Sequence, residues 1–261
     1  MAEPTEYDTK KVEYKNLIAK LYLPKTSKKV PVVIAFGGSD PSWGMADANG
    51  EMMARNGIAV IGLVYFKMDP SLPPTLDHIP LEYFIDAINY AETVPQIDAA
   101  KIGVVSGSRG SEPGFLISIL DQRVKSVVIT TPSHVAWGGM TTASSAWTYQ
   151  GKDIPSMRLP DIANVPQLQR FAKALEDQEQ VRKAMFAFEK INGPLLLVSA
   201  SNDQIWPSTL MSKQIVDYLK AKQFPHQVDH KIYPTGHGFS SKTAPEIKQM
   251  IIDHFVRTLK N

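Results

Sequence analysis

The feature that most constrains the fold of this chain is a short stretch in which an apolar run ends in small residues and a helical pattern follows at once. The apolar run covers residues 102–105, the small residues surround Ser108, and the helical pattern covers residues 110–120. A serine at such a sharp strand-to-helix turn needs small neighbours, because larger side chains two positions away would collide with it. The stretch therefore predicts a nucleophile elbow, although Ser106 replaces the first glycine of the usual G-x-S-x-G pattern.

Strand-like and helix-like segments alternate along most of the chain. Continuous apolar runs predict buried strands at residues 30–36, 58–66, 124–130 and 193–200. Strands that alternate with helices form a parallel sheet with helices on both faces. The first 29 residues contain an alternating stretch that predicts a hairpin at the sheet edge. We therefore expect one α/β domain over residues 1–261 with a doubly wound, mostly parallel sheet.

Two residues further along the chain complete a catalytic pattern with Ser108. Asp203 lies where the run 193–200 meets a loop, and His237 lies between two glycines after a strand-like segment. A serine hydroxyl needs a base to take its proton, and an aspartate orients that base and stabilises its charged form. The plainer alternatives are a helix-capping aspartate and a loop histidine that only packs. The order Ser, Asp, His at strand ends predicts the triad of an α/β-hydrolase.

The oxyanion of a tetrahedral intermediate needs two backbone N–H donors about 3 Å away. Arg109 follows the nucleophile, so its N–H is the first candidate donor, at the start of a helix whose dipole favours negative charge. The second donor is expected in the loop after the strand 30–36. Gly38 and Ser39 are both candidates there, and the sequence leaves the choice between them open.

Residues 133–190 interrupt the alternation of strands and helices. The segment is too long for a simple loop in a compact domain, so we predict a cap insertion that lies over the nucleophile. Its aromatic residues Trp137, Trp147 and Tyr149 are candidates for the walls of an acyl pocket, with ordinary packing inside the cap as the alternative.

Composition excludes several other kinds of chemistry. The chain has no cysteine, which rules out disulfides, thiolate zinc sites and a cysteine nucleophile. A net charge of +2 with scattered basic residues predicts no nucleic-acid partner, and no apolar run approaches the roughly 20 residues of a membrane span. His226 and His230 flank a strand-like pair, where four residues span about 13 Å, so a shared metal is not expected. We predict neither a metal nor a cofactor.

The start of the chain bears on its compartment. Residues 1–4 contain no apolar signal region. If Met1 is the native start, we expect a cytoplasmic protein, and if a signal peptide has been removed, a periplasmic or secreted one. The sequence does not indicate an oligomeric state.

Several stretches beyond the elbow resemble a known family. In chain order they are IAFGGS (34–39), LVYF (63–66), IPLEYF (79–84), SRGSE (108–112), SAWTY (145–149), KINGP (190–194) and DQIWPS (203–208). In this order and spacing they resemble the C-terminal catalytic domain of the acyl-CoA thioesterase and bile acid-CoA:amino acid N-acyltransferase family. The resemblance runs from about residue 30 to the C-terminus.

The resemblance implies an α/β-hydrolase fold, the triad Ser108, Asp203 and His237, and a small-molecule acyl thioester or ester as substrate. Amino-acid-conjugating members of the family use a cysteine nucleophile and thioesterases use serine, so Ser108 implies transfer of the acyl group to water. Larger relatives carry an N-terminal β-sandwich domain, for which residues 1–29 leave room only for the hairpin. This difference weakens the expectation of CoA specificity.

Two alternatives to an acyl-CoA thioesterase remain. The first is a dienelactone-hydrolase-like enzyme or a general carboxylesterase for short acyl groups, which would have the same fold and triad. The second is a catalytically weak binding protein that keeps the pocket. The second is motivated by Ser106, because its hydroxymethyl group occupies a position where the elbow leaves little space.

Overall fold

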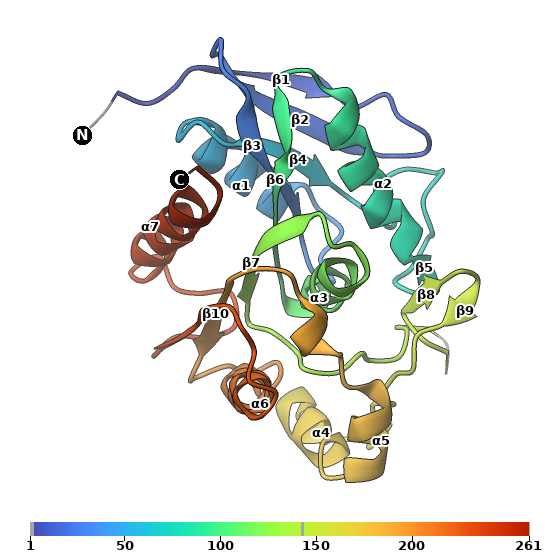
Figure 1. Ribbon diagram of the computed structural model, residues 1–261. Helices are drawn as coiled ribbons and strands as arrows, with labels where there is room; N and C mark the ends of the chain where they lie inside the picture. The colour runs from blue at the N-terminus through green and yellow to red at the C-terminus, as the bar shows by residue number, and fades with distance from the viewer. Residues whose placement is uncertain (1–2, 142–143, 261) are drawn as a thin grey trace.

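The computed structural model describes residues 3–141 and 144–260. Met1, on which the expected compartment depends, and two positions of the predicted cap, Thr142 and Ala143, therefore lie outside the described residues. Within the described residues, eight strands form the central sheet (Figure 1). In spatial order they are β1 (Tyr7–Lys11), β2 (Ala19–Pro24), β4 (Ala59–Leu63), β3 (Val30–Phe36), β6 (Ile97–Gly107), β7 (Val124–Thr130), β10 (Leu195–Ala200) and β11 (Val228–Tyr233).

The sheet is parallel from β4 to β11 and antiparallel only at one edge. There β1 pairs with β2, and β2 with β4, in antiparallel register. All the other neighbouring pairs are parallel. The predicted mostly parallel α/β sheet is confirmed, and the carboxyl ends of β3, β6, β10 and β11 meet at one edge, where ligands bind in folds of this kind.

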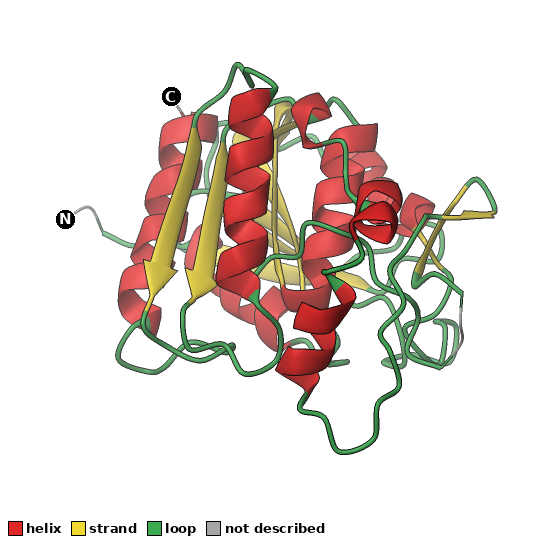
Figure 2. Cartoon of the chain, turned by 90° about the horizontal axis from the view of Figure 1, so that it is seen from below, coloured by secondary structure: helices red, strands yellow, loops and turns green. Residues whose placement is uncertain are grey.

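Helices cover both faces of the sheet (Figures 1 and 2). Alternate side chains of a strand point to opposite faces, so Val32 and Ile34 join one apolar core and Val33 and Ala35 the other. The first core is covered by α2 (Leu81–Thr93), α3 (Ser111–Leu120) and α6 (Ser208–Ala221). The second is covered by α1 (Gly44–Ala54) and by α7 (Ala244–Phe255) with its π-helical extension η3 (Val256–Lys260). None of the described helices is long and apolar enough to cross a membrane.

The segment between β7 and β10 contains the elements of the predicted cap. It holds β8 (Trp147–Tyr149), β9 (Lys152–Asp153), α4 (Gln167–Ala174), α5 (Gln178–Ala184) and the 3-10 turn η2 (Phe188–Lys190). Strand β8 pairs with β9 and with β5 (Ile79–Pro80) in a small second sheet. Buried apolar residues of α4 and α5 form a cluster of their own with Trp206 and Met211, at the foot of the molecule in Figure 1. This cluster joins the segment to the loop after β10 and to α6.

Candidate active site

The turn that follows β6 has the geometry expected of an elbow. Ser108 has φ +53°, a left-handed conformation that is rare outside glycine and that marks stored strain. It opens the 3-10 turn η1 (Ser108–Gly110), which leads directly into α3. A side chain at Gly110 would overlap the carbonyl oxygen of Gly37, so this position requires glycine. The turn therefore holds the Ser108 side chain at the carboxyl edge of the sheet.

Ser106, the departure from the usual elbow pattern, is accommodated by the facing helix. Its side chain is completely buried, and its hydroxyl has no hydrogen-bond partner among the described residues. A Cβ atom at Gly114 of α3 would overlap Ser106 Oγ. The missing side chain at position 114 thus supplies the space that Ser106 needs, and the elbow keeps its shape.

Three residues that the sequence placed at separate strand ends lie in hydrogen-bond contact. His237 Nε2 lies 2.8 Å from Ser108 Oγ, and His237 Nδ1 lies 2.8 Å from Asp203 Oδ2. Ser108 follows β6, Asp203 follows β10 and His237 follows β11, so the shared sheet edge brings them together. The His237 side chain is 20% exposed and that of Asp203 only 2%, which leaves the imidazole within reach of a substrate.

The surroundings of Asp203 keep its side chain ionised. The backbone N–H groups of Ile205 and Trp206 donate to Oδ1 at 2.9 and 3.3 Å. Burial opposes ionisation, but the hydrogen bonds from His237 and Ser208 outweigh it and hold the pKa of the Asp203 carboxyl below its usual value. A carboxylate can only accept, so Nδ1 of His237 carries the proton. Nε2 is then free to accept the Ser108 hydroxyl proton.

The backbone of the loop after β3 lies directly against the elbow. A Cβ atom at Gly38 would come within 2.9 Å of Ser108 Cβ and 3.2 Å of the Arg109 backbone nitrogen. This close approach brings the peptides on either side of Gly38 next to the nucleophile. Ser39 follows in the same loop and lines the adjoining cavity. The three predicted oxyanion-hole residues therefore gather around Ser108, and the choice between Gly38 and Ser39 stays open.

Tyr65, which the sequence analysis missed, orients that loop. Its hydroxyl lies 2.6 Å from the carbonyl oxygen of Gly38 and 3.0 Å from that of Gly37, and burial strongly raises its pKa, so it donates. A trans peptide points its C=O and N–H in opposite directions, so the N–H groups of Gly38 and Ser39 turn away from Tyr65. Two sequence signals pointed to it: its place two residues beyond the end of β4, the neighbour of β3, and the family-like stretch LVYF at residues 63–66.

A buried ion pair joins the elbow to the segment between β7 and β10. Arg109 Nη1 lies 3.1 Å from Glu112 Oε1, and Glu112 is completely buried. The other carboxylate oxygen accepts from the Trp137 backbone N–H and from Trp147 Nε1 at 2.9 and 2.7 Å. Burial raises the pKa of Glu112 to about 7, against the attraction of Arg109 and the two N–H donors. Arg109 Nη2 also donates to the carbonyl of Gly138 at 3.0 Å.

A cavity of about 480 Å³ adjoins the elbow. Ser39 and Arg109 line it, and its walls include Trp137 but neither of the other two predicted pocket residues. The expectation for Trp147 is corrected: it is completely buried in the main core, with its ring 5.8 Å from that of Tyr65. Tyr149 packs half-buried against the same core and is not among the residues that line the cavity. Both positions follow from the pairing of β8 with β5.

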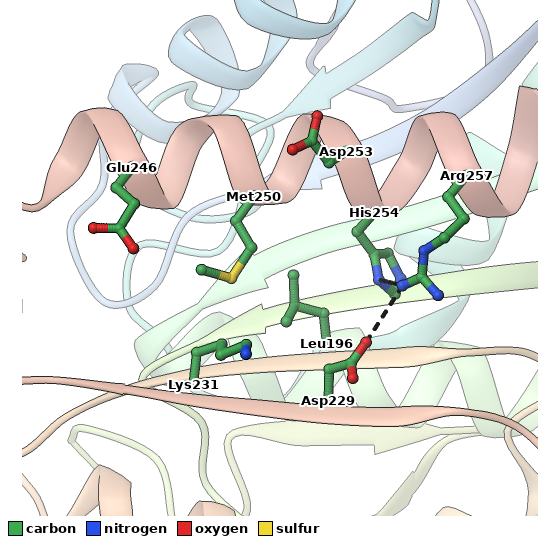
Figure 3. Close-up of a pocket in the computed structure, with 8 residues that line it drawn as sticks. All are labelled: Leu196, Asp229, Lys231, Glu246, Met250, Asp253, His254 and Arg257. Atoms are coloured by element: carbon green, nitrogen blue, oxygen red, sulfur yellow. Dashed lines mark hydrogen bonds and ion pairs between the residues drawn. The ribbon is translucent and has the colours of Figure 1, made fainter.

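A second pocket, of about 360 Å³, lies between α7 and the last two strands (Figure 3). His254 of α7 and Arg257 of its extension η3 face Leu196 of β10 and Asp229 of β11, and Arg257 Nη2 lies 3.3 Å from Asp229 Oδ2. None of its lining residues belongs to the elbow or to the loop after β3, whereas Arg109 and Ser39 of those two segments line the cavity at the elbow. The cavity at the elbow is therefore the candidate active site.

The family model and the curated relatives that match this chain point to the same family. A family model described as "BAAT / Acyl-CoA thioester hydrolase C terminal" matches residues 79–254. The chain is 25% identical to acyl-coenzyme A thioesterase 3 of Mus musculus, over 84% of this chain and 50% of that protein. It is 27% identical to acyl-coenzyme A amino acid N-acyltransferase 1 of Mus musculus, over 77% of this chain and 46% of that protein. The chain thus spans about half the length of these relatives.

Solved structures confirm the predicted α/β-hydrolase fold. A puromycin-hydrolyzing peptidase of Mycobacterium tuberculosis superimposes with a TM-score of 0.66 at 14% identity, over 98% of this chain and 39% of that one. Dienelactone hydrolase of Anabaena variabilis superimposes with a TM-score of 0.61 at 14% identity, over 98% of this chain and 99% of that one. At such low identity the likeness establishes the fold alone.

Proposed function

The chain belongs to the BAAT / acyl-CoA thioester hydrolase C-terminal family, and from this premise we propose that it is a serine hydrolase that cleaves acyl thioesters or carboxylic esters through an acyl-enzyme. The observation that carries the proposal is the continuous line of hydrogen bonds from Asp203 through His237 to Ser108 Oγ. Such a line activates a hydroxyl that is otherwise a weak nucleophile. The left-handed backbone at Ser108 adds support, because it presents Oγ at the sheet edge.

The first half of the reaction forms the acyl-enzyme. Ser108 Oγ attacks the carbonyl carbon of the substrate while His237 Nε2 takes the hydroxyl proton, and the charge of Asp203 stabilises the imidazolium. The carbonyl oxygen becomes an oxyanion that accepts hydrogen bonds from the Arg109 N–H and from that of Gly38 or Ser39. The bond to the leaving group then breaks. The departing thiol or alcohol takes its proton from His237, which leaves the acyl group on Ser108.

The second half transfers the acyl group to water. His237, neutral again, takes a proton from water as it attacks the acyl carbon, and a second oxyanion forms in the same position. Its collapse breaks the bond to Ser108 Oγ, which recovers its proton from His237 and releases a carboxylic acid. The acyl-enzyme on Ser108 is an oxygen ester, which is a weaker acyl donor than the thioester that a cysteine nucleophile would form. We therefore expect the acyl group to be transferred to water, which His237 activates, and not to an amine.

We further propose that residues 1–261 act as one hydrolase domain in which residues 133–190 serve as the cap. Three observations support this division. The segment shares an apolar cluster with Trp206, its Trp137 lines the elbow cavity, and the ion pair of Arg109 and Glu112 ties it to the nucleophile turn. The cap would then set which acyl groups reach Ser108.

A hydrolysis panel tests the proposed activity. It compares acyl-CoAs of increasing chain length with p-nitrophenyl esters, for the wild type and Ser108→Ala, and includes glycine as an alternative acceptor analysed by mass spectrometry. We expect release of thiol from acyl-CoA with free acid as the product, and loss of turnover in Ser108→Ala. A strict preference for short p-nitrophenyl esters would replace the thioesterase assignment with a carboxylesterase. Conjugates of glycine, or turnover that persists in Ser108→Ala, would contradict the proposal.

A further inference from the structure

The cavity at the elbow combines apolar walls with an excess of positive charge. Arg109, Arg158 and Arg170 line it, and no acidic residue is among the described residues that do. Trp137 and Phe171 form part of its apolar wall, with their rings in edge-to-face contact at 4.6 Å. A substrate that fills this cavity therefore meets apolar surface and guanidinium groups together.

The three arginines differ in how well their charges are already paired. Arg109 is paired with Glu112 in the buried contact described above. Arg170 donates through Nε to the carbonyl of Pro160 at 2.8 Å, and its nearest acid, Asp161, lies 3.7 Å away and is fully exposed. An ion pair with an exposed partner at that distance contributes little interaction energy, so Asp161 offsets little of the Arg170 charge. One charge of the cavity is thus weakly compensated at Arg170.

Arg158 is the least compensated charge in the cavity. Its side chain is exposed, and it has neither a hydrogen bond nor an ion pair with any described residue. Arg158 and Arg170 face the same space, near the first turn of α4, which begins at Gln167. The free N–H groups and dipole of a helix N-terminus also favour negative charge. Guanidinium groups in such a setting suit a carboxylate or a phosphate, which they can bind with two parallel hydrogen bonds.

We propose that this cavity is an anion subsite of the active site, in which Arg158 and Arg170 bind a carboxylate or phosphate carried by the substrate. Trp137 and Phe171 contact the apolar part of the same molecule. The inference rests on the proposed hydrolase function, because the cavity is lined by Arg109, which follows the nucleophile in the chain, and by Ser39 of the facing loop. The anionic group can come from the leaving group, as in the phosphates of coenzyme A, or from an acyl chain that ends in a second carboxylate.

Matched substrate pairs distinguish these two sources. The first pair is butyryl-CoA and butyryl-pantetheine, of which only the CoA thioester carries phosphates, together with adenosine, on its leaving group. The second is mono-p-nitrophenyl glutarate and p-nitrophenyl valerate, which differ in the charge at the end of the acyl chain. For each pair, kcat/KM is measured for the wild type, Arg158→Gln, Arg170→Gln and the double variant. Arg182→Gln serves as the control, because Arg182 is an exposed arginine of α5 that does not line the cavity.

A charge-assisted hydrogen bond contributes enough to predict at least a tenfold fall in the anionic-to-neutral ratio of kcat/KM for the double variant. We expect this fall in only one of the two pairs, mainly because KM rises for its anionic member. The fall should be smaller at high salt, which screens the charges. Arg182→Gln should leave both ratios unchanged. If neither ratio falls, including the case in which both members of each pair lose activity equally, the subsite is overturned.

A binding measurement keeps the subsite separate from the activity. Titration calorimetry of Ser108→Ala with coenzyme A and with glutarate should detect one of the two ligands, and Arg158→Gln in the same background should weaken that ligand at least tenfold. Binding without hydrolysis in the wild type would refute the proposed function and support the subsite. If neither ligand binds, or if Arg158→Gln binds as tightly as its parent, the subsite is refuted whatever the activity.

Discussion

Replacing Tyr65 with phenylalanine removes one hydroxyl and tests how the oxyanion loop is held. The Tyr65 side chain is buried, and its hydroxyl lies 2.6 and 3.0 Å from the carbonyl oxygens of Gly38 and Gly37. A buried carbonyl that is left without a hydrogen-bond donor lowers the free energy of unfolding by about 1–3 kcal/mol. For a chain of 261 residues, each kcal/mol lowers Tm by about 2–4 °C, so we expect a loss of about 2–12 °C.

The same change should slow catalysis more than it weakens substrate binding. Removal of one oxyanion donor typically lowers kcat by about 10²–10³. In Tyr65→Phe the donor N–H is still present but less firmly held, so we expect kcat to fall less, by about tenfold to a hundredfold. Tyr218→Phe is the control, because its hydroxyl donates to Glu189 in another part of the molecule. Steady-state kinetics and thermal melts are recorded for both variants. If Tyr65→Phe keeps its kcat, or if Tyr218→Phe loses as much, the loop is not held in the way we infer.

Three further changes test the site. Gly38→Ala places a methyl group 2.9 Å from Ser108 Cβ, so kcat should fall at least tenfold in ester assays, and normal turnover would contradict the close packing. Asp203→Asn should lower kcat by about 10⁴ by favouring the wrong tautomer of His237, with circular dichroism as the control for folding. Burial raises the pKa of Glu112 to about 7, above the value near 4.3 of an unfolded chain, so the folded state binds more protons between these values. The free energy of unfolding should then fall by up to about 1.4 kcal/mol per pH unit from pH 5 to 7. Urea titrations at several pH values should show this slope in the wild type and its loss in Glu112→Gln. A wild-type free energy of unfolding that does not change with pH would contradict the prediction.

Local patterns in the sequence were enough to predict the fold and the positions of the Ser108, Asp203 and His237 side chains. A continuous apolar run marks a strand that is buried on both faces, and the run at residues 124–130 has the bounds of β7. In a parallel sheet all carboxyl ends lie at one edge, so polar residues after such runs come together without further information. The catalytic roles of the three residues remain predictions.

The contacts that tune the site could not be predicted, because they join elements far apart in the chain. Tyr65 reaches Gly38 only because β4 lies next to β3, and no local pattern marks the hydroxyl as a donor. Trp147 was expected in a pocket, but the pairing of β8 with β5 places it in the core, where its indole N–H meets Glu112. The space for Ser106 likewise depends on the absence of a side chain at position 114.

Covalent labelling tests the central claim most directly. The protein is treated with a fluorophosphonate, which reacts with activated serine hydroxyls, and the modified peptide is identified by mass spectrometry. Our account predicts one adduct, on Ser108, that disappears in Ser108→Ala and forms at least about 10³ times more slowly in His237→Gln. An unlabelled wild type, an adduct on another serine, or equally fast labelling of His237→Gln would contradict the claim that His237 activates Ser108.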